Sequence, residues 1–199
     1  MDKRLEIEKY LDKNSIFNAV NFYNEPNELM IILNIVISRK RWDNIDTVMT
    51  KFPYTEDYDD LKINIINLYG CFFKEYDLKN LIRCIFNDNS KLEIFNKNIS
   101  KFSDIISFRQ IVNSFNSDEL KCDLFARYQY YFDGEGFSDY LRKLKSDETR
   151  KSEFHKYVKQ YDSIRLDWIA ASFSNDKDRM EFYEDNFAYL LCRHYRLWL

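Results

Sequence analysis

The chain has 199 residues, of which 45% are hydrophobic and 18% are aromatic. This composition is too apolar for an intrinsically disordered protein, and the length suits one domain or one run of stacked repeats. The formal net charge is −3 at pH 7. A domain that binds nucleic acid usually carries a basic surplus, so we expect no nucleic acid among the partners.

Glycine and proline are rare, with 3 and 2 residues respectively. Sandwiches and barrels built from β-strands need many turns, and turns draw heavily on these two residue types. We therefore expect an all-α fold, built as an irregular stack of helical hairpins. A helical bundle without repeats is the alternative.

Helices are predicted in the first half of the chain from apolar residues at helical spacing and from start and stop signals. Pro26 stands where a helix begins, and Phe52-Pro53 ends another. The predicted helices cover residues 4–24, with a break at Asn14-Ser15, and residues 27–41, 42–51, 59–74 and 77–86. An acidic connector occupies residues 54–60, and a loop follows at residues 87–90.

Two of the aromatic–Asp pairs in the first half of the chain, Trp42-Asp43 and Tyr76-Asp77, indicate a repeat. The offset from Trp42 to Tyr76 also relates Phe52 to Phe86, Ile31 to Ile65 and Ile32 to Ile66. We interpret each unit as a long helix, a tight corner at the aromatic–Asp pair and a shorter helix, with the Asp as the N-cap of the second helix.

A helix–turn–helix repeat of about 34 residues resembles the tetratricopeptide class. The stretch NLYGCFFKEYDLKNLIRCI carries the resemblance, which covers about residues 28–87, with Phe72, Asp77, Leu81 and Ile85 at matching positions. Tyr69 and Leu81 depart from the family pattern, which prefers a small residue and alanine at these places. The resemblance implies a TPR-like solenoid with a groove that holds another polypeptide.

The second half of the chain is predicted to be helical as well, but less regular. Residues 91–116 form shorter helices that interrupt the period, and Gly134 or Gly136 closes a helix in the left-handed conformation. A helix is predicted to end at residue 132, and the next one covers residues 137–144. A further helix begins in the polar stretch 145–153 and reaches Tyr161. The last two predicted helices cover residues 164–173 and 177–197.

We expect one all-helical domain over residues 1–199, with a helical-repeat part at 1–145 and C-terminal capping helices at 146–199. The stretch FAYLLCRHYRLWL within the last helix is apolar enough to cover the end of the array. It is equally compatible with a homodimer surface.

Cofactors, metals and catalytic residues are not expected. The 4 cysteines form no C-x-x-C pair and only 2 histidines are present, so a zinc site is disfavoured and free thiols are the default. Cys192 and His194 stand two apart on a predicted helix, so they point to different faces. The charged N-terminus lacks an apolar signal segment, and the apolar stretch from Leu29 to Ile37 is about half a membrane crossing. We therefore expect a cytoplasmic protein without membrane contact.

The function that these features favour is non-enzymatic protein binding. Tyrosine is enriched in interfaces, and exposed acids attract a basic partner. The candidate partner-binding residues lie in two stretches, Tyr54, Glu56, Asp57, Tyr58, Asp59 and Asp60, and Tyr128, Tyr130 and Tyr131. Analogy at the level of fold class suggests neutralisation or regulation of a partner, as by a toxin immunity protein, a phage or viral inhibitor, or an adaptor.

Two alternatives belong to other classes. The first is an enzyme or effector with an unfamiliar pocket that uses Glu153, His155 and Asp167. The second is a nucleic-acid-binding regulator that uses Arg39, Lys40 and Arg41. An aromatic core, rather than an interface, is the competing explanation for the many tyrosines.

Overall fold

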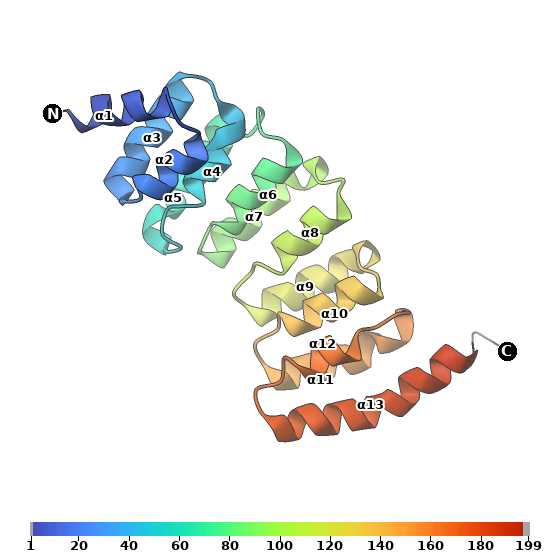
Figure 1. Cartoon of the computed structure of the whole chain (residues 1–199). Coiled ribbons are helices and arrows are strands. Elements are labelled where there is room, and N and C mark those ends of the chain that lie inside the picture. Colours follow the sequence, from blue (N-terminus) through green and yellow to red (C-terminus); the bar gives the residue numbers. More distant parts are fainter. Residues whose placement is uncertain (1, 197–199) are drawn as a thin grey trace. The chain divides into compact units, whose positions relative to one another are not determined.

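A computed structural model describes residues 2–196 of the chain, and the side chains of residues 2–187. This part of the chain contains thirteen α-helices, five short 3₁₀ helices and no β-strand, which confirms the all-α prediction (Figure 1). Contacts divide the chain into two compact units, Met1–Asn116 and Ser117–Leu199. The predicted repeat part at 1–145 and capping part at 146–199 stay predictions.

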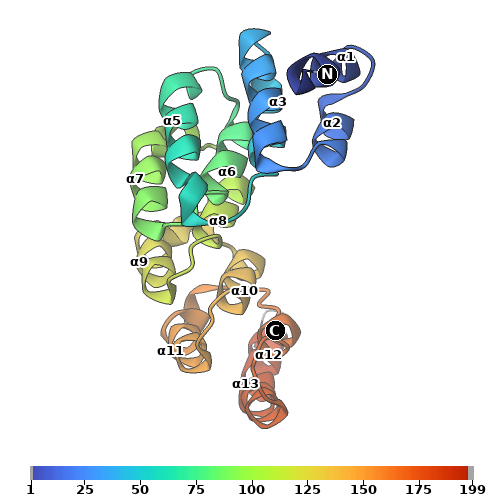
Figure 2. The ribbon, with the colours of Figure 1, turned by 90° about the vertical axis from the view of Figure 1, so that its left-hand side faces the viewer.

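The first unit is a stack of antiparallel helices in two layers. Its α-helices are α1 (Lys3–Leu11), α2 (Ile16–Phe22), α3 (Pro26–Ser38), α4 (Ile45–Met49), α5 (Asp59–Tyr69), α6 (Glu75–Arg83), α7 (Asp88–Asn98) and α8 (Ile105–Val112). Helices α5 and α7 lie side by side in one layer, and α6 and α8 in the other (Figure 2). Phe95 on α7 contacts Phe108 on α8 with ring centroids 5.3 Å apart, which joins the two layers in the core.

The second unit has the same construction over its described residues. Its α-helices are α9 (Asp118–Tyr128), α10 (Gly134–Arg142), α11 (Asp147–Tyr157), α12 (Leu166–Ala170) and α13 (Asp176–Arg196). Phe125 on α9 stacks on Tyr140 of α10 at 4.1 Å, and Tyr140 is fully buried. Phe182 on α13 covers Phe154 and Phe173, and the three rings close this end of the core. Part of the tyrosine surplus therefore belongs to the core.

Several local predictions are confirmed. The break at Asn14-Ser15 separates α1 from α2, because Ser15 is the N-cap of α2 and accepts the N–H of Asn18. Pro26 is the first residue of α3. The polar stretch 145–153 holds the start of α11.

Other local predictions are wrong. Asp77 does not cap α6: Lys74 is the N-cap, and the Asp77 carboxylate lies one turn inside and accepts the Lys74 N–H at 3.3 Å. Gly134 and Gly136 do not close a helix but lie in the first turn of α10, after the N-cap Asp133. By contrast, the shorter helices predicted within residues 91–116 are present, as most of α7 and all of α8. The apolar C-terminal stretch after Phe187 lies outside the described side chains, and so do Cys192 and His194.

Alternate helices begin at a nearly constant interval. Helices α5, α7, α9, α11 and α13 start at Asp59, Asp88, Asp118, Asp147 and Asp176. Four of the preceding residues act as caps: Asn87, Ser117, Ser146 and Asn175 each accept a backbone N–H of the following turn. The interval between these helix starts is shorter than the offset between the two aromatic–Asp pairs, and the resemblance to tetratricopeptide repeats stays a prediction.

Each of these helices carries an acid at its first position and a base three residues later. We call such a pair a clamp. Four clamps have a buried base: Asp59 with Lys62, Asp88 with Lys91, Asp118 with Lys121, and Asp147 with Arg150. The carboxylate of Asp59 accepts the backbone N–H groups of Phe86 and Asn87 at 2.8 and 2.6 Å. The ammonium of Lys62 donates to the carbonyl of Cys84, the C-cap of α6, at 2.7 Å.

The other buried clamps repeat these contacts. Lys91 donates to the carbonyl of Ser114 and Lys121 to that of Lys143, both at 2.7 Å. Asp88 accepts the N–H of Asn116, Asp118 accepts those of Lys145 and Ser146, and Asp147 accepts that of Ser174. The base thus satisfies a carbonyl at or near the C-terminus of the second helix, and the acid holds the turn that leads to the next pair.

The clamp on α13 differs from the other four. Asp176 pairs with Arg179 at 2.9 Å, but the Asp176 side chain is 90% exposed, and its carboxylate accepts no backbone N–H of a following turn within the described residues. The acid therefore lacks the buried hydrogen bonds that its equivalents on α5, α7, α9 and α11 make.

Candidate functional site

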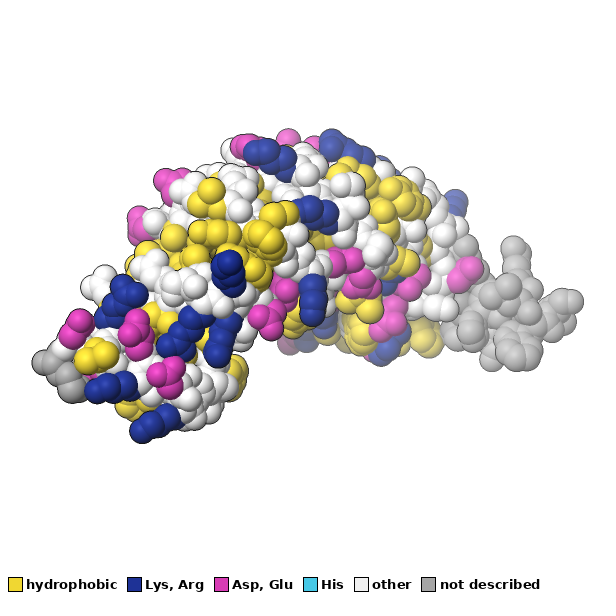
Figure 3. Space-filling model, turned by 90° about the horizontal axis from the view of Figure 1, so that it is seen from above, with side chains coloured by type: hydrophobic (Ala, Val, Ile, Leu, Met, Phe, Trp, Pro, Cys, Tyr) yellow, Lys and Arg dark blue, Asp and Glu magenta, His cyan; other side chains and the backbone are white. Residues whose placement is uncertain are grey.

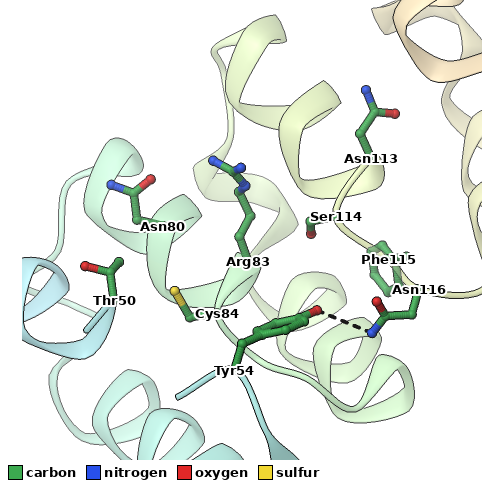
Figure 4. Close-up of a pocket in the computed structure, with 9 residues that line it drawn as sticks. All are labelled: Thr50, Tyr54, Asn80, Arg83, Cys84, Asn113, Ser114, Phe115 and Asn116. Atoms are coloured by element: carbon green, nitrogen blue, oxygen red, sulfur yellow. Dashed lines mark hydrogen bonds between the residues drawn. The ribbon is translucent and has the colours of Figure 1, made fainter. Parts of the chain in front are cut away.

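A concave site in the first unit lies where three helices end. Thr50, Cys84 and Asn113 are the C-cap residues of α4, α6 and α8, and all three line this hollow of about 470 Å³. Its lining also includes Tyr54, Asn80, Arg83, Ser114, Phe115 and Asn116 (Figure 4). The site exists because α4, α6 and α8 lie in one layer, so their C-terminal ends come together.

Tyr54 forms one wall of the hollow and joins it to the clamps. Its hydroxyl oxygen accepts hydrogen bonds from the Lys91 ammonium at 3.2 Å and from the Asn116 amide at 3.3 Å. Its ring contacts Phe86 edge-on at 5.2 Å. Since the hydroxyl is the acceptor in both bonds, its own hydrogen remains available for a ligand.

Arg83 supplies the positive charge of the hollow. It lies in the last turn of α6, it is exposed, and it makes no hydrogen bond or ion pair with another described residue. Figure 4 shows its side chain between Asn80 on one side and Asn113 and Ser114 on the other. The residues that line the hollow include this arginine and no aspartate or glutamate. The arrangement therefore favours a negatively charged ligand group.

Burial shifts the pKa values of the groups around the hollow. It lowers the pKa of Lys91 from 10.5 to about 8, although Asp88 and Asp59 raise it in part. Burial also raises the pKa of Tyr54, so its hydroxyl stays protonated at neutral pH. The pKa of the Cys84 thiol is raised by burial against the opposing effect of Lys62 and Arg83. Cys84 is thus a neutral thiol, without the character of a nucleophile.

The acidic connector, predicted as one surface, divides into exposed and buried residues. Glu56, Asp57 and Asp60 are exposed, and Glu56 accepts a hydrogen bond from the Asn87 amide at 3.0 Å. Tyr58 is half-buried and its ring packs on Phe52 at 5.4 Å. Asp59 is only 4% exposed and belongs to the first buried clamp, so it offers no surface to a partner.

The three predicted tyrosines of the second unit gather at one place. Tyr128 ends α9, and Tyr130 and Tyr131 form the 3₁₀ turn that follows. The rings of Tyr130 and Tyr131 are 4.4 Å apart, and those of Tyr128 and Tyr130 are 6.5 Å apart. Tyr130 is 72% exposed. We call Tyr128, Tyr130 and Tyr131 the tyrosine cluster.

The residues of the enzyme alternative make separate contacts. Glu153 is buried and accepts a hydrogen bond from the Tyr140 hydroxyl at 3.0 Å, whereas Asp167 pairs with Arg165 at 3.0 Å. His155 is exposed and meets the ring of Phe154. No hydrogen bond or ion pair joins Glu153, His155 and Asp167 within the described part of the chain.

The basic run of the nucleic-acid alternative ends a helix. Arg39 pairs with Asp12 at 3.0 Å, and Lys40 has a positive φ of 54°. The N–H of Arg41 bonds to the carbonyl of Val36, and that of Lys40 to Ile37, which is the hydrogen-bond pattern of a Schellman motif. On the face shown in Figure 3, basic and acidic side chains are interspersed with apolar ones and form no continuous basic stripe.

Comparisons with known proteins do not identify the chain. Neither family models nor curated proteins nor solved structures give a match. Among the residues whose placement is described, no group of three His, Cys, Asp or Glu side chains could hold a metal ion. Within the same residues, each helix is too short or too polar to cross a membrane.

Sequence reasoning found Tyr54 but missed the rest of the hollow. Asn80 and Arg83 lie on α6, whereas residues 113–116 follow α8, and no spacing in the sequence links these two groups. The available signal was indirect: Asn80, Arg83 and Cys84 stand three and four residues apart on one helix face, which makes a polar stripe on a short amphipathic helix.

Proposed function

We propose that this chain is a protein-binding module without bond chemistry of its own, which neutralises or regulates a partner protein. The observation that carries the proposal is the tyrosine cluster, in which Tyr130 is 72% exposed and packed against Tyr131. A large ring held in place by a neighbour offers contact area at little cost in conformational entropy, which is typical of interface anchors.

The exposed acids of the connector support the same function. Glu56, Asp57 and Asp60 are exposed on the first unit. Acidic side chains at an interface rim chiefly raise the association rate of a basic partner and add less to the lifetime of the complex. An immunity protein, an inhibitor or an adaptor would each use surfaces of this kind.

The test is affinity capture with the full chain, followed by binding measurements with the purified partner. Tyr130→Ala should weaken binding by about 30-fold, the effect of removing an interface anchor worth about 2 kcal/mol. Tyr76→Ala is the matched control, because Tyr76 is 62% exposed but belongs to the other unit, with the Lys79 ammonium over its ring. Capture of no stable partner, or equal binding by both variants, would overturn the proposal.

A further inference from the structure

The hollow at the C-terminal ends of α4, α6 and α8 presents hydrogen-bond donors whose acceptors are not in the chain. Arg83 has five N–H groups and no described hydrogen-bond or ion-pair partner. The Tyr54 hydroxyl accepts two bonds and has a hydrogen left to donate. Both groups line the same hollow.

Other polar groups of the lining are already engaged inside the protein. The Thr50 hydroxyl donates to the Thr47 carbonyl at 3.1 Å, and the Ser114 hydroxyl donates to the Ile111 carbonyl at 2.7 Å. The Asn80 amide donates to Asp46 at 3.0 Å. Few side-chain hydrogen-bond donors of the lining are therefore available to a ligand, and Arg83 is the lining residue that carries a charge.

The charge of Arg83 also stands apart from the charges of the neighbouring clamps. Lys62 and Lys91 are fully buried, and each lies 3.7 Å from the acid of its own clamp. These two charges are compensated, whereas Arg83 faces no carboxylate in the lining. The position of Arg83 in the last turn of α6 suits the helix dipole, but that interaction leaves the guanidinium N–H groups free.

We infer that this hollow binds a carboxylate of the partner protein, with Arg83 as the residue that recognises it and Tyr54 as a second donor. A guanidinium binds a carboxylate through two parallel N–H···O bonds, which fixes orientation as well as charge. The inference rests on the proposed protein-binding function and adds to it the chemistry of one contact: a glutamate, an aspartate or a C-terminal carboxylate seated in the hollow.

The experiment uses the ¹⁵N-labelled full chain and two small probes observed by NMR. The probes are N-acetyl-glutamate N-methylamide and its neutral glutamine counterpart. We expect the glutamate probe to shift the Arg83 side-chain signal and the backbone amides of residues 83–84 and 113–116, and the glutamine probe to leave them in place. Equal shifts with both probes would overturn the inference.

Two variants locate the contact. Arg83→Gln should weaken binding of the glutamate probe at least about tenfold, the loss of one charge-assisted contact. Arg41→Gln is the control, because Arg41 is also exposed on the first unit but does not line the hollow. Unchanged binding in Arg83→Gln would overturn the assignment.

A third arm separates a partner's carboxylate from a free anion. Inorganic phosphate at the same ionic strength should bind more weakly than the glutamate probe, and tighter binding of phosphate would overturn the inference in favour of a small-anion site. The outcome is independent of the Tyr130 test. If the chain captures a partner but the probe does not bind, the carboxylate site alone fails; if the probe binds and no partner is captured, the protein-binding function fails.

Discussion

Asp59 accepts the backbone N–H of Asn87 at 2.6 Å, although 28 residues separate the two in the sequence. The bond links the first turn of α5 to the N-cap of α7, so one carboxylate joins two consecutive helix pairs. The same relationship recurs at Asp118 and Ser146. A buried carboxylate that accepts two N–H groups is strongly stabilising only while both donors are present, which makes the clamps sensitive to substitution.

Removal of a clamp acid should destabilise the second unit. Asp118→Ala leaves the N–H groups of Lys145 and Ser146 and the buried Lys121 without their carboxylate. We expect a loss of about 3 kcal/mol in the free energy of unfolding. Native-state hydrogen exchange should also show reduced protection of the Lys145 and Ser146 amides.

The control for this prediction is Asp176→Ala, at the same motif position on α13. The Asp176 side chain is 90% exposed and pairs with Arg179, so its removal should change the free energy of unfolding by no more than about 0.5 kcal/mol. Equal effects of the two substitutions would contradict the role of the clamp.

The buried Lys91 should make stability depend on pH in the alkaline range. Burial lowers its pKa to about 8 in the folded chain, against 10.5 in the unfolded chain. Below about pH 8 the Lys91 ammonium is protonated in both the folded and the unfolded chain. The free-energy cost of burying its charge in the folded chain is therefore fully present. Between these two values the unfolded state binds more protons, so raising the pH stabilises the fold, by up to about 3 kcal/mol from this group.

The measurement compares chemical unfolding of the wild type and Lys91→Met across this range. The difference in free energy of unfolding, wild type minus variant, should rise as the pH increases from about 8. Reading the profile below about pH 10 limits the contribution of tyrosine ionisation. A flat difference would show that Lys91 titrates at an ordinary pKa.

Gly134 should not tolerate a side chain. A Cβ atom at this position would lie 1.6 Å from the carbonyl oxygen of Asp162 and 3.0 Å from the carbonyl carbon of Ser163. Because both obstacles are backbone atoms, the loop before α12 would have to move away from α10. We expect Gly134→Ala to lower the free energy of unfolding by about 3 kcal/mol, as measured by thermal unfolding.

The neighbouring exposed residue gives the comparison for Gly134. Glu135→Ala changes a side chain in the same helical turn without meeting this loop, so it should alter stability by no more than about 0.5 kcal/mol. Similar melting temperatures for the two variants would show that the close approach of the loop is not required.

Lys40 offers a stabilising substitution. Its φ of 54° lies in the left-handed region, where a Cβ atom is strained and glycine is not. Lys40→Gly should raise the free energy of unfolding by about 1 kcal/mol, because the hydrogen bonds that end α3 are made by the backbone. Lys40→Ala keeps the Cβ atom and should give no gain; an equal gain from alanine would refute the explanation.

The prediction of local structure from the sequence succeeded where neighbouring residues decide the outcome. The cap at Ser15 and the helix start at Pro26 follow from backbone chemistry within one turn. The prediction for Asp77 was wrong because Asp can serve either as N-cap or at the third helical position of a capping box, and the preceding residues decide between the two.

The clamp interval was also present in the sequence, as an acid–base pair at i and i+3 that recurs from Asp59 to Asp176. Hydrophobic spacing led instead to the longer offset, which relates Phe52 to Phe86 and Ile31 to Ile65 and does not include the recurring acid–base pairs. Lysine is almost never fully buried unless it is paired. The complete burial of Lys62 and Lys91 therefore could not be inferred before their carbonyl partners were known.

The sequence by itself determined that the chain is helical and where most helices begin, because helical periodicity, caps and the scarcity of glycine and proline act over a few residues. Only the tertiary structure decided which charges are buried and which are exposed. Asp59 and Asp60 are neighbours in the sequence, yet one holds a turn inside the fold and the other faces solvent. Arg83 and Tyr54 line one hollow because three helices end side by side, and a contact of that kind depends on packing between distant segments.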